Sequence, residues 1–162
     1  MRLKNRTAVM TGAGSGIGRA CALEFAKEGA NVMAVDINID GARETVRMIE
    51  EEKGTAVAWK TDVANPDSVA RMVDAALKNF SKVDTLVNNA AIQVNKTVED
   101  TTFEEWNLQM SINVGGVFLC SKLLLPHLRE TKGSIVSMSS VNGFFVEPFC
   151  AGYCATKAAI MG

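Results

Sequence analysis

The chain has 162 residues, of which 48% are apolar and 22% charged, and its formal net charge is -1. This length suits one domain with a sizeable core, and the balanced charge favours neither a disordered chain nor a nucleic-acid-binding surface. Residues 1–6 carry charge but precede no apolar run of signal-peptide type, and no segment is expected to span a membrane. We therefore expect a cytoplasmic globular protein without nucleic-acid or membrane partners.

The predicted elements alternate between strands and helices along the whole chain. Short, mostly apolar strands are expected at residues 7–11, 31–35, 56–60, 85–88 and 134–137. Helices are expected at residues 16–28, 39–53 and 66–80, and from a capping box at 102–105 towards Pro126. Apolar strands of this kind are typical of a parallel sheet with helices on both faces. The pattern predicts an α/β fold with a doubly wound parallel sheet, whose ligands collect at the carboxyl ends of the strands.

The first strand runs into a turn that contains four glycines and then into an amphipathic helix. Glycines allow positive φ and let a ligand approach the backbone, while the N-terminus of the helix favours a diphosphate. The residues expected to contact the cofactor here are Gly12, Gly14, Ser15, Gly16, Ile17 and Gly18. Neither register fits the widespread fingerprint with glycines at relative positions 1, 3 and 6. A tight turn that binds nothing is the alternative.

Asp36 ends the second strand, 20 residues beyond Gly16. At that distance, dinucleotide-binding folds place an acid that accepts hydrogen bonds from the adenosine ribose and repels the 2′-phosphate of NADP. We therefore predict NAD as the preferred cofactor. The alternative is that Asp36 only caps the following helix.

Tyr153 and Lys157 form an i, i+4 pair on one face of a helix. A phenol has an unperturbed pKa of about 10, and a nearby ammonium together with a positive cofactor ring favours the phenolate. Lys157 is thus predicted to activate Tyr153 as a general base. An ordinary surface pair is the alternative. Ser140 lies 13 residues before Tyr153.

These features resemble the short-chain dehydrogenase/reductase family, classical type. The matching motifs occur in the family's order and spacing along the whole chain: Thr-Gly-x-x-x-Gly-x-Gly from Thr11 to Gly18, Asp62-Val63, Asn88-Asn89-Ala90-Ala91, Asn113, Ser140 and Tyr153-x-x-x-Lys157. The resemblance implies a Rossmann-type fold with five of the family's seven strands. It also supports NAD, because Ser15 and Ile37 are uncharged where NADP-preferring relatives often carry a base.

The resemblance assigns further cofactor contacts. Asp62 would hydrogen-bond the adenine amino group and Val63 would pack against the ring. The segment Asn88, Asn89 and Ala90 would support the sheet and the cofactor's ribose; alternatively, the asparagines simply end a strand and start a turn. Ala91 stands where the family usually has glycine, so slight crowding of the backbone is expected there.

The resemblance also assigns catalytic roles. Ser140 would donate a hydrogen bond to the substrate oxygen, and neighbouring Ser139 is the weaker candidate. The carbonyl of Asn113 would hold a water that passes protons through Lys157, although Asn113 could instead be a core amide. Lys157 would also hold the nicotinamide ribose beside Tyr153.

The implied activity is NAD-dependent hydride transfer between a secondary alcohol or ketone and nicotinamide. An epimerase, a dehydratase or a dinucleotide sensor of the same family stays open, as does a nucleotide-binding or interaction module without catalysis. The apolar residues Phe144, Phe145, Val146, Pro148 and Phe149 favour an apolar substrate, whereas Gln93, Asn95 and Asn142 would suit a polyol.

Four cysteines, Cys21, Cys120, Cys150 and Cys154, are scattered without a CxxC pair, which fits reduced thiols. Cys150 and Cys154 could form half of a metal site, but His127 is the only histidine. We therefore predict small apolar core residues and no metal.

The sequence stops five residues after Lys157, which predicts barely one turn of the catalytic helix. The family continues with two strands, a nicotinamide-binding segment and a substrate loop. We therefore expect residues 1–162 to be the adenosine-binding part of a longer enzyme that lacks complete nicotinamide and substrate sites. The complete form is expected to be a homo-oligomer, with Gly115 and Gly116 at a close helix approach in the interface.

Overall fold

The computed structural model describes residues 1–162 and contains one five-stranded parallel sheet with the order β3-β2-β1-β4-β5. The strands are β1 (Thr7–Thr11), β2 (Asn31–Asp36), β3 (Thr55–Lys60), β4 (Thr85–Asn88) and β5 (Ser134–Ser137). The helices are α1 (Gly16–Lys27), α2 (Ile39–Glu51), α3 (Pro66–Phe80), α4 (Phe103–Gln109), α5 (Gly116–Thr131) and α6 (Ala151–Ala159). A π-helical turn, η1 (Met110–Gly115), joins α4 to α5, and a 3-10 turn, η2 (Val141–Gly143), precedes α6.

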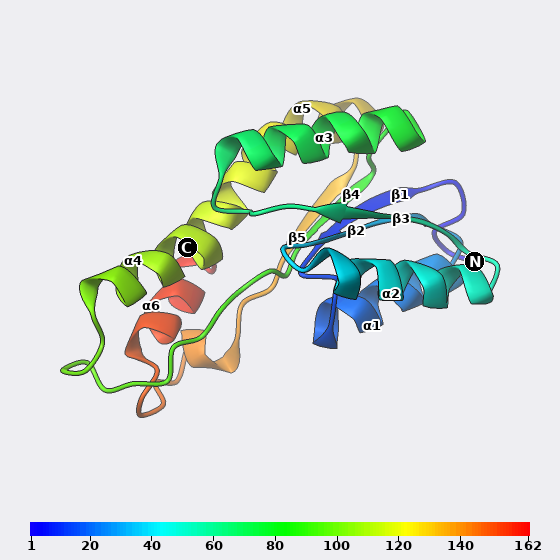
Figure 1. Ribbon diagram of the computed structural model, residues 1–162. Helices are drawn as coiled ribbons and strands as arrows, with labels where there is room; N and C mark the ends of the chain where they lie inside the picture. The colour runs from blue at the N-terminus through cyan, green and yellow to red at the C-terminus, as the bar shows by residue number, and fades with distance from the viewer.

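Helices cover both faces of the sheet, which confirms the predicted doubly wound, Rossmann-type α/β fold. Figure 1 shows α1 and α2 on one face and α3 and α5 on the other, while α4 and α6 lie together beyond the end of the sheet. Because all five strands are parallel, their carboxyl ends share one edge, where such folds bind ligands.

Alternating side chains of the strands supply two separate cores. Val9 is in register with Met33 and Leu86, and all three belong to the cluster under α3 and α5. Met10 is in register with Val87, and both belong to the cluster under α1 and α2. Successive residues of a strand point to opposite faces, so a strand buried on both sides must be apolar throughout.

The strand and helix boundaries predicted for residues 7–88 are confirmed to within two residues. The prediction that the long helix stops near Pro126 is wrong, because α5 continues through this proline to Thr131. Pro126 is exposed, so the carbonyl that loses its helical partner can bind water. Leu124 and Leu128, buried on either side, hold the helix against the sheet.

The continuous helical stretch Phe103–Thr131 bears on the expectation that no segment spans a membrane. It is 29 residues long with a mean hydropathy of 1.4 over its most apolar window, so by length and composition it could cross a membrane. A helix that packs on a core passes the same test, and α5 contributes Cys120, Leu124 and Leu128 to the core under α3 and α5.

Asp84 joins the start of the sheet to the N-terminal segment. One carboxylate oxygen accepts a hydrogen bond from Arg6 Nη1 at 2.7 Å and the other from the Thr7 amide at 2.9 Å, while Lys82 Nζ lies 3.1 Å away. Burial raises the pKa of the Asp84 carboxyl, but the hydrogen bonds from Arg6, Thr7 and Lys82 outweigh it, and the pKa lies below its ordinary value of 3.8.

Replacing Asp84 with asparagine is expected to lower the free energy of unfolding by about 2–3 kcal/mol at pH 7, because charged hydrogen bonds to a buried group are lost. A carboxyl whose pKa is lowered by folding stabilises the native state above its unfolded pKa, and this contribution disappears as pH falls through the folded value. The gap between the two proteins should therefore narrow as the pH falls from about 5 to 2. Urea unfolding at several pH values measures it, with exposed Asp74→Asn as the control. A gap independent of pH would contradict the role of the charge.

Candidate functional site

A cleft of about 420 Å³ opens at the carboxyl edge of the sheet, between the glycine turn, the ends of β2 and β3, the loop after β4, and η1. The predicted cofactor residues that line it are Gly12, Ser15, Gly16, Ile17, Asp36, Asp62, Val63, Asn89 and Ala90. Gly14, Gly18 and Asn88 are buried and do not line the cleft. Tyr153 and Lys157 do not line it either.

The four glycines of the turn are needed for two different reasons. Gly12 and Gly16 have φ of +66° and +51°, a conformation that residues with a side chain rarely adopt. Gly14 and Gly18 have ordinary φ, but each has no space for a Cβ. A Cβ at Gly18 would lie 2.0 Å from the Gly12 carbonyl oxygen, and one at Gly14 would lie 2.7 Å from Asp36 Oδ2.

Asn89 fastens the glycine turn to the neighbouring strand β4. Its Nδ2 donates hydrogen bonds to the carbonyl oxygens of Thr11 at 3.1 Å and Gly12 at 3.2 Å. The Thr11 hydroxyl accepts from the amides of Asn89 and Ala90. A Cβ at Gly18 would lie 2.6 Å from Asn89 Nδ2, so the Asn89 side chain occupies the space that a side chain at position 18 would need.

Asp36 projects from the end of β2 against the turn. Its Oδ2 accepts from the Gly14 amide at 2.8 Å and its Oδ1 from the Asn38 amide at 2.9 Å. The alternative of a helix cap does not hold, because Asn38 is the N-cap of α2 and accepts from the amides of Asp40 and Gly41. Each Asp36 oxygen keeps acceptor capacity for a ligand hydroxyl.

The loop after β3 carries Asp62 and Val63. Asp62 is exposed, and its Oδ1 accepts from the Ala64 amide at 2.9 Å. Val63 is buried beside Gly116, where an added Cβ would lie 2.8 Å from the valine Cγ2. The close approach expected at Gly116 is thus made within this chain, whereas a Cβ at Gly115 would meet only an ordinary contact at 3.7 Å.

Asn88 ties together three elements, since its Nδ2 donates to Ser121 Oγ on α5 at 3.1 Å and to Ser137 Oγ on β5 at 3.3 Å. Ala91 lines the cleft without a positive φ. Alanine adopts such a backbone conformation without strain, and the slight crowding expected there stays a prediction.

Asn113 lies in the π-helical turn η1 and is 1% exposed. Its Oδ1 accepts from the Ile92 amide at 2.8 Å, and its Nδ2 donates to the Ile92 carbonyl at 2.8 Å and to Thr156 Oγ1 at 3.0 Å. Asn113 thereby fixes one wall of the cleft, formed by Ile92 and Ile112, to helix α6.

The helix that carries Tyr153 and Lys157 is longer than the single turn predicted, because it begins at Ala151, before Tyr153, and runs to Ala159. Lys157 is buried, and burial lowers the pKa of its ammonium. Its Nζ donates to the Met138 carbonyl at 2.7 Å and lies 5.6 Å from the centroid of the Tyr153 ring.

The segment after β5 packs against the same helix. Ser139 Oγ donates to the Lys157 carbonyl at 2.8 Å, whereas Ser140 Oγ accepts from the Asn142 amide at 3.2 Å. A Cβ at Gly143 would lie 3.0 Å from the Lys157 carbonyl oxygen. The tertiary structure therefore places the serine segment directly on the helix of the predicted base.

The apolar stretch between Ser140 and Tyr153 faces solvent rather than the core. Its exposed side chains are Phe144, Phe145, Val146 and Phe149. Of the polar alternatives, Asn142 Nδ2 donates to Glu147 Oε2 and Cys150 Sγ, and Gln93 Nε2 donates to Asn95 Oδ1. The three phenylalanines of this stretch therefore do not fill the core.

Cys120, Cys150 and Cys154 are buried, as predicted for small apolar residues, while Cys21 is partly buried. Burial raises the pKa of the Cys120 thiol to about 12 and also raises that of Cys150. The sulfur atoms of Cys150 and Cys154 lie 3.5 Å apart.

Four residues that the motifs did not identify line the cleft. They are Val35, Thr61, Ile92 and Ile112. Thr61 could have been found from its place just after a strand at the carboxyl edge. Ile92 and Ile112 carry no polar signal, and only the structure shows that both line the cleft and that Asn113 binds the backbone of Ile92.

Residues 6–162 match the model of the family described as "short chain dehydrogenase". Meso-2,3-butanediol dehydrogenase of Serratia marcescens is 37% identical, over 99% of this chain and 63% of its own length. A 3beta-hydroxysteroid dehydrogenase of Eggerthella lenta is 40% identical, over 98% of this chain and 62% of its own length. The chain thus spans about three fifths of the length of these curated relatives.

A solved structure shares the fold closely. The crystal structure of a short-chain dehydrogenase/reductase from Burkholderia phymatum in complex with NAD has a TM-score of 0.95 and 30% sequence identity. The match covers 99% of this chain and 58% of that one.

Proposed function

The chain belongs to the short-chain dehydrogenase/reductase family. We propose that it binds NAD in the cleft beside Asp36 and forms part of an enzyme that oxidises secondary alcohols or reduces ketones. The observation that carries this proposal is the pairing of a glycine cradle without space for side chains with a carboxylate at its rim. The first can accept a diphosphate against backbone amides, and the second can accept both hydroxyls of a ribose.

The residues of the cleft fit a nicotinamide dinucleotide. Gly12 lines the cleft, and a Cβ at Gly12, Gly14 or Gly18 would collide with its neighbours, so the turn keeps its shape only with glycine at these positions. Asp62 and Val63 stand at the adjacent strand end, where we propose that they bind the adenine. When bound, NAD supplies the acceptor for hydride, and the protein supplies binding, orientation and proton transfer.

For the chemistry, we propose Tyr153 as the base that takes the alcohol proton and Ser140 as the donor that holds the substrate oxygen. Lys157 supports this role because its buried ammonium stands 5.6 Å from the Tyr153 ring and is held by the Met138 carbonyl. Both Nδ2 protons of Asn113 are donated, to the Ile92 carbonyl and to Thr156, and its Oδ1 accepts from the Ile92 amide, so we propose that a relay water binds the backbone carbonyl of Asn113.

The rest of the assignment concerns partners and location. The relatives are longer than this chain, and we propose that residues from their remaining length complete the nicotinamide and substrate sites. The exposed apolar loop at Phe144–Val146 favours a substrate with an apolar part. Exposed Phe118 and Leu125 on α5 suit an interface of a homo-oligomer, and free cysteines suit the cytoplasm.

Titration of the chain with both cofactors tests the proposal. NAD is expected to bind more tightly than NADP, because the Asp36 carboxylate accepts from ribose hydroxyls and repels a 2′-phosphate. Asp36→Ala should weaken NAD about ten- to a hundredfold, as the loss of charged hydrogen bonds predicts. Exposed Asp40→Asn, which removes a charge from the neighbouring helix α2, is the matched control. Equal affinities for NAD and NADP, or an unchanged preference in Asp36→Ala, would remove this role from Asp36.

A further inference from the structure

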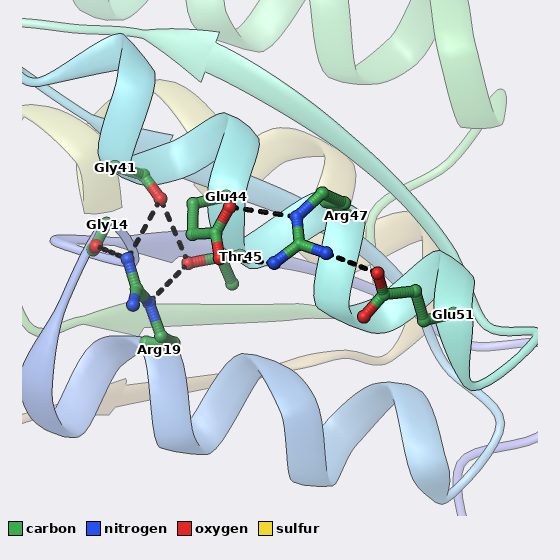
Figure 2. A network of polar contacts seen from close by, with 7 residues as sticks. All are labelled: Gly14, Arg19, Gly41, Glu44, Thr45, Arg47 and Glu51. Carbon is green, nitrogen blue, oxygen red and sulfur yellow. Dashed lines mark hydrogen bonds and ion pairs between the residues drawn. The ribbon is translucent and has the colours of Figure 1, made fainter.

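Arg19 and Thr45 link the glycine turn to the first turns of α2. Figure 2 shows the Arg19 side chain reaching from α1 to Gly14, Gly41 and Thr45. Its Nη2 donates to the carbonyl oxygens of Gly14 and Gly41, and its Nε donates to Thr45 Oγ1 at 3.0 Å. Thr45 is fully buried, and neither residue lines the cleft.

The Thr45 hydroxyl has one proton to donate, and the shorter of its two acceptor contacts is the Ala13 carbonyl at 2.7 Å. The Gly41 carbonyl lies farther away, at 3.2 Å. Arg19 donates to a lone pair of the same hydroxyl, so Thr45 can accept from Arg19 while it donates its proton to the nearer acceptor, the Ala13 carbonyl. A Cβ at Gly41 would lie 2.9 Å from the Gly14 carbonyl oxygen, so α2 and the turn are in direct contact.

These contacts determine where the amides of the turn point. In a trans peptide the C=O and N–H groups point in opposite directions. Thr45 holds the Ala13 carbonyl towards α2, so the Gly14 N–H points the other way and donates to Asp36 Oδ2 at 2.8 Å. Arg19 holds the Gly14 carbonyl in the same way, which directs the Ser15 N–H away from α2.

We propose that Arg19 and Thr45 are positioning residues that set the Asp36 carboxylate for the adenosine ribose by fixing the two peptides on either side of Gly14. The inference rests on the proposed ribose-binding role of Asp36. Loss of the Thr45 hydroxyl frees the Ala13–Gly14 peptide to rotate, and the carboxylate then loses the amide that orients it. A ligand is recognised less well where it uses its ribose hydroxyls, while its contacts elsewhere persist.

The test measures the affinities for ADP and 2′-deoxy-ADP by calorimetric titration. It uses the wild-type chain and the variants Asp36→Asn, Thr45→Val, Thr45→Ser and Arg19→Met. The unchanged chain is expected to prefer ADP about tenfold, as a charged hydrogen bond to the 2′-hydroxyl predicts. Thr45→Val and Arg19→Met should lower this preference to about twofold or less. Thr45→Ser, which keeps the hydroxyl, should keep the preference of about tenfold. Exchange of the Gly14 amide proton, followed by NMR without ligand, should be faster in Thr45→Val than in Thr45→Ser.

Arg47→Met is the matched control for Arg19→Met. Figure 2 shows Arg47 on α2, the helix of Thr45, where it pairs only with the exposed Glu44 and Glu51. It should keep the preference for ADP. If Asp36→Asn keeps the preference too, the ribose role of Asp36 fails and this inference fails with it. If Asp36→Asn loses the preference while Thr45→Val and Arg19→Met keep it, the inference alone is overturned. A merely structural role would weaken both nucleotides equally and leave the ratio unchanged, which also overturns it.

Discussion

Replacing Tyr153 with phenylalanine is expected to lower turnover of a secondary alcohol by about a hundredfold or more, the usual contribution of a general base. The affinity for NAD should stay nearly unchanged, because the ring that lies 5.6 Å from Lys157 Nζ is retained. The fold should also be unaffected, since Tyr153 is only partly buried and phenylalanine has the same ring. Binding and chemistry should therefore separate at this residue.

The measurement is alcohol oxidation followed by NADH formation, with NAD affinity determined on the same preparations. It is made on the chain itself and on a version extended to the length of its relatives, of which it spans about three fifths. Comparison of the two forms also tests the proposal that further residues complete the substrate site. If the phenylalanine variant keeps more than about a hundredth of the rate, Tyr153 is not the base.

Replacing Gly18 with alanine is expected to weaken NAD binding by about a hundredfold and to lower the free energy of unfolding by about 1–3 kcal/mol. The new Cβ would lie 2.0 Å from the Gly12 carbonyl oxygen and 2.6 Å from Asn89 Nδ2. Backbone cannot yield as a flexible side chain can, so the turn must move away from the hydrogen bonds that Asn89 makes to Thr11 and Gly12. Stability and NAD affinity should thus fall together.

Gly115→Ala is the matched control for Gly18→Ala. Its Cβ would meet the Met110 carbonyl oxygen at 3.7 Å, an ordinary contact, and its backbone is helical. This variant should bind NAD normally and be as stable as the unchanged chain or more so, since alanine favours helix over glycine by about 1 kcal/mol. Thermal unfolding and NAD titration of the two variants decide the matter. Normal NAD affinity in Gly18→Ala would show that the cofactor does not depend on this turn.

Most strands and helices could be predicted from the sequence, because they depend on residues that are close together in the chain. Apolar runs placed the strands, and Asn65 accepts from the Ser68 amide as the N-cap with Pro66 in the first helical turn. The capping box of Thr102 and Glu105 is likewise formed. Pro126 misled the prediction because helix propensity is local, whereas α5 continues under the packing of Leu124 and Leu128. Long-range burial there outweighed a local signal.

The sequence by itself determined the order of strands and helices, the family, and the residue types of the candidate site, because spacing along the chain carries that information. It did not show that Gly14 and Gly18 serve space rather than positive φ, since the atoms they make room for, in Asp36, Asn89 and Gly12, come from elsewhere in the turn or from other strand ends. Nor did it show that Thr45 holds the turn, from 32 residues along the chain. Those roles depend on contacts between segments that folding brings together, and only the tertiary structure decided them.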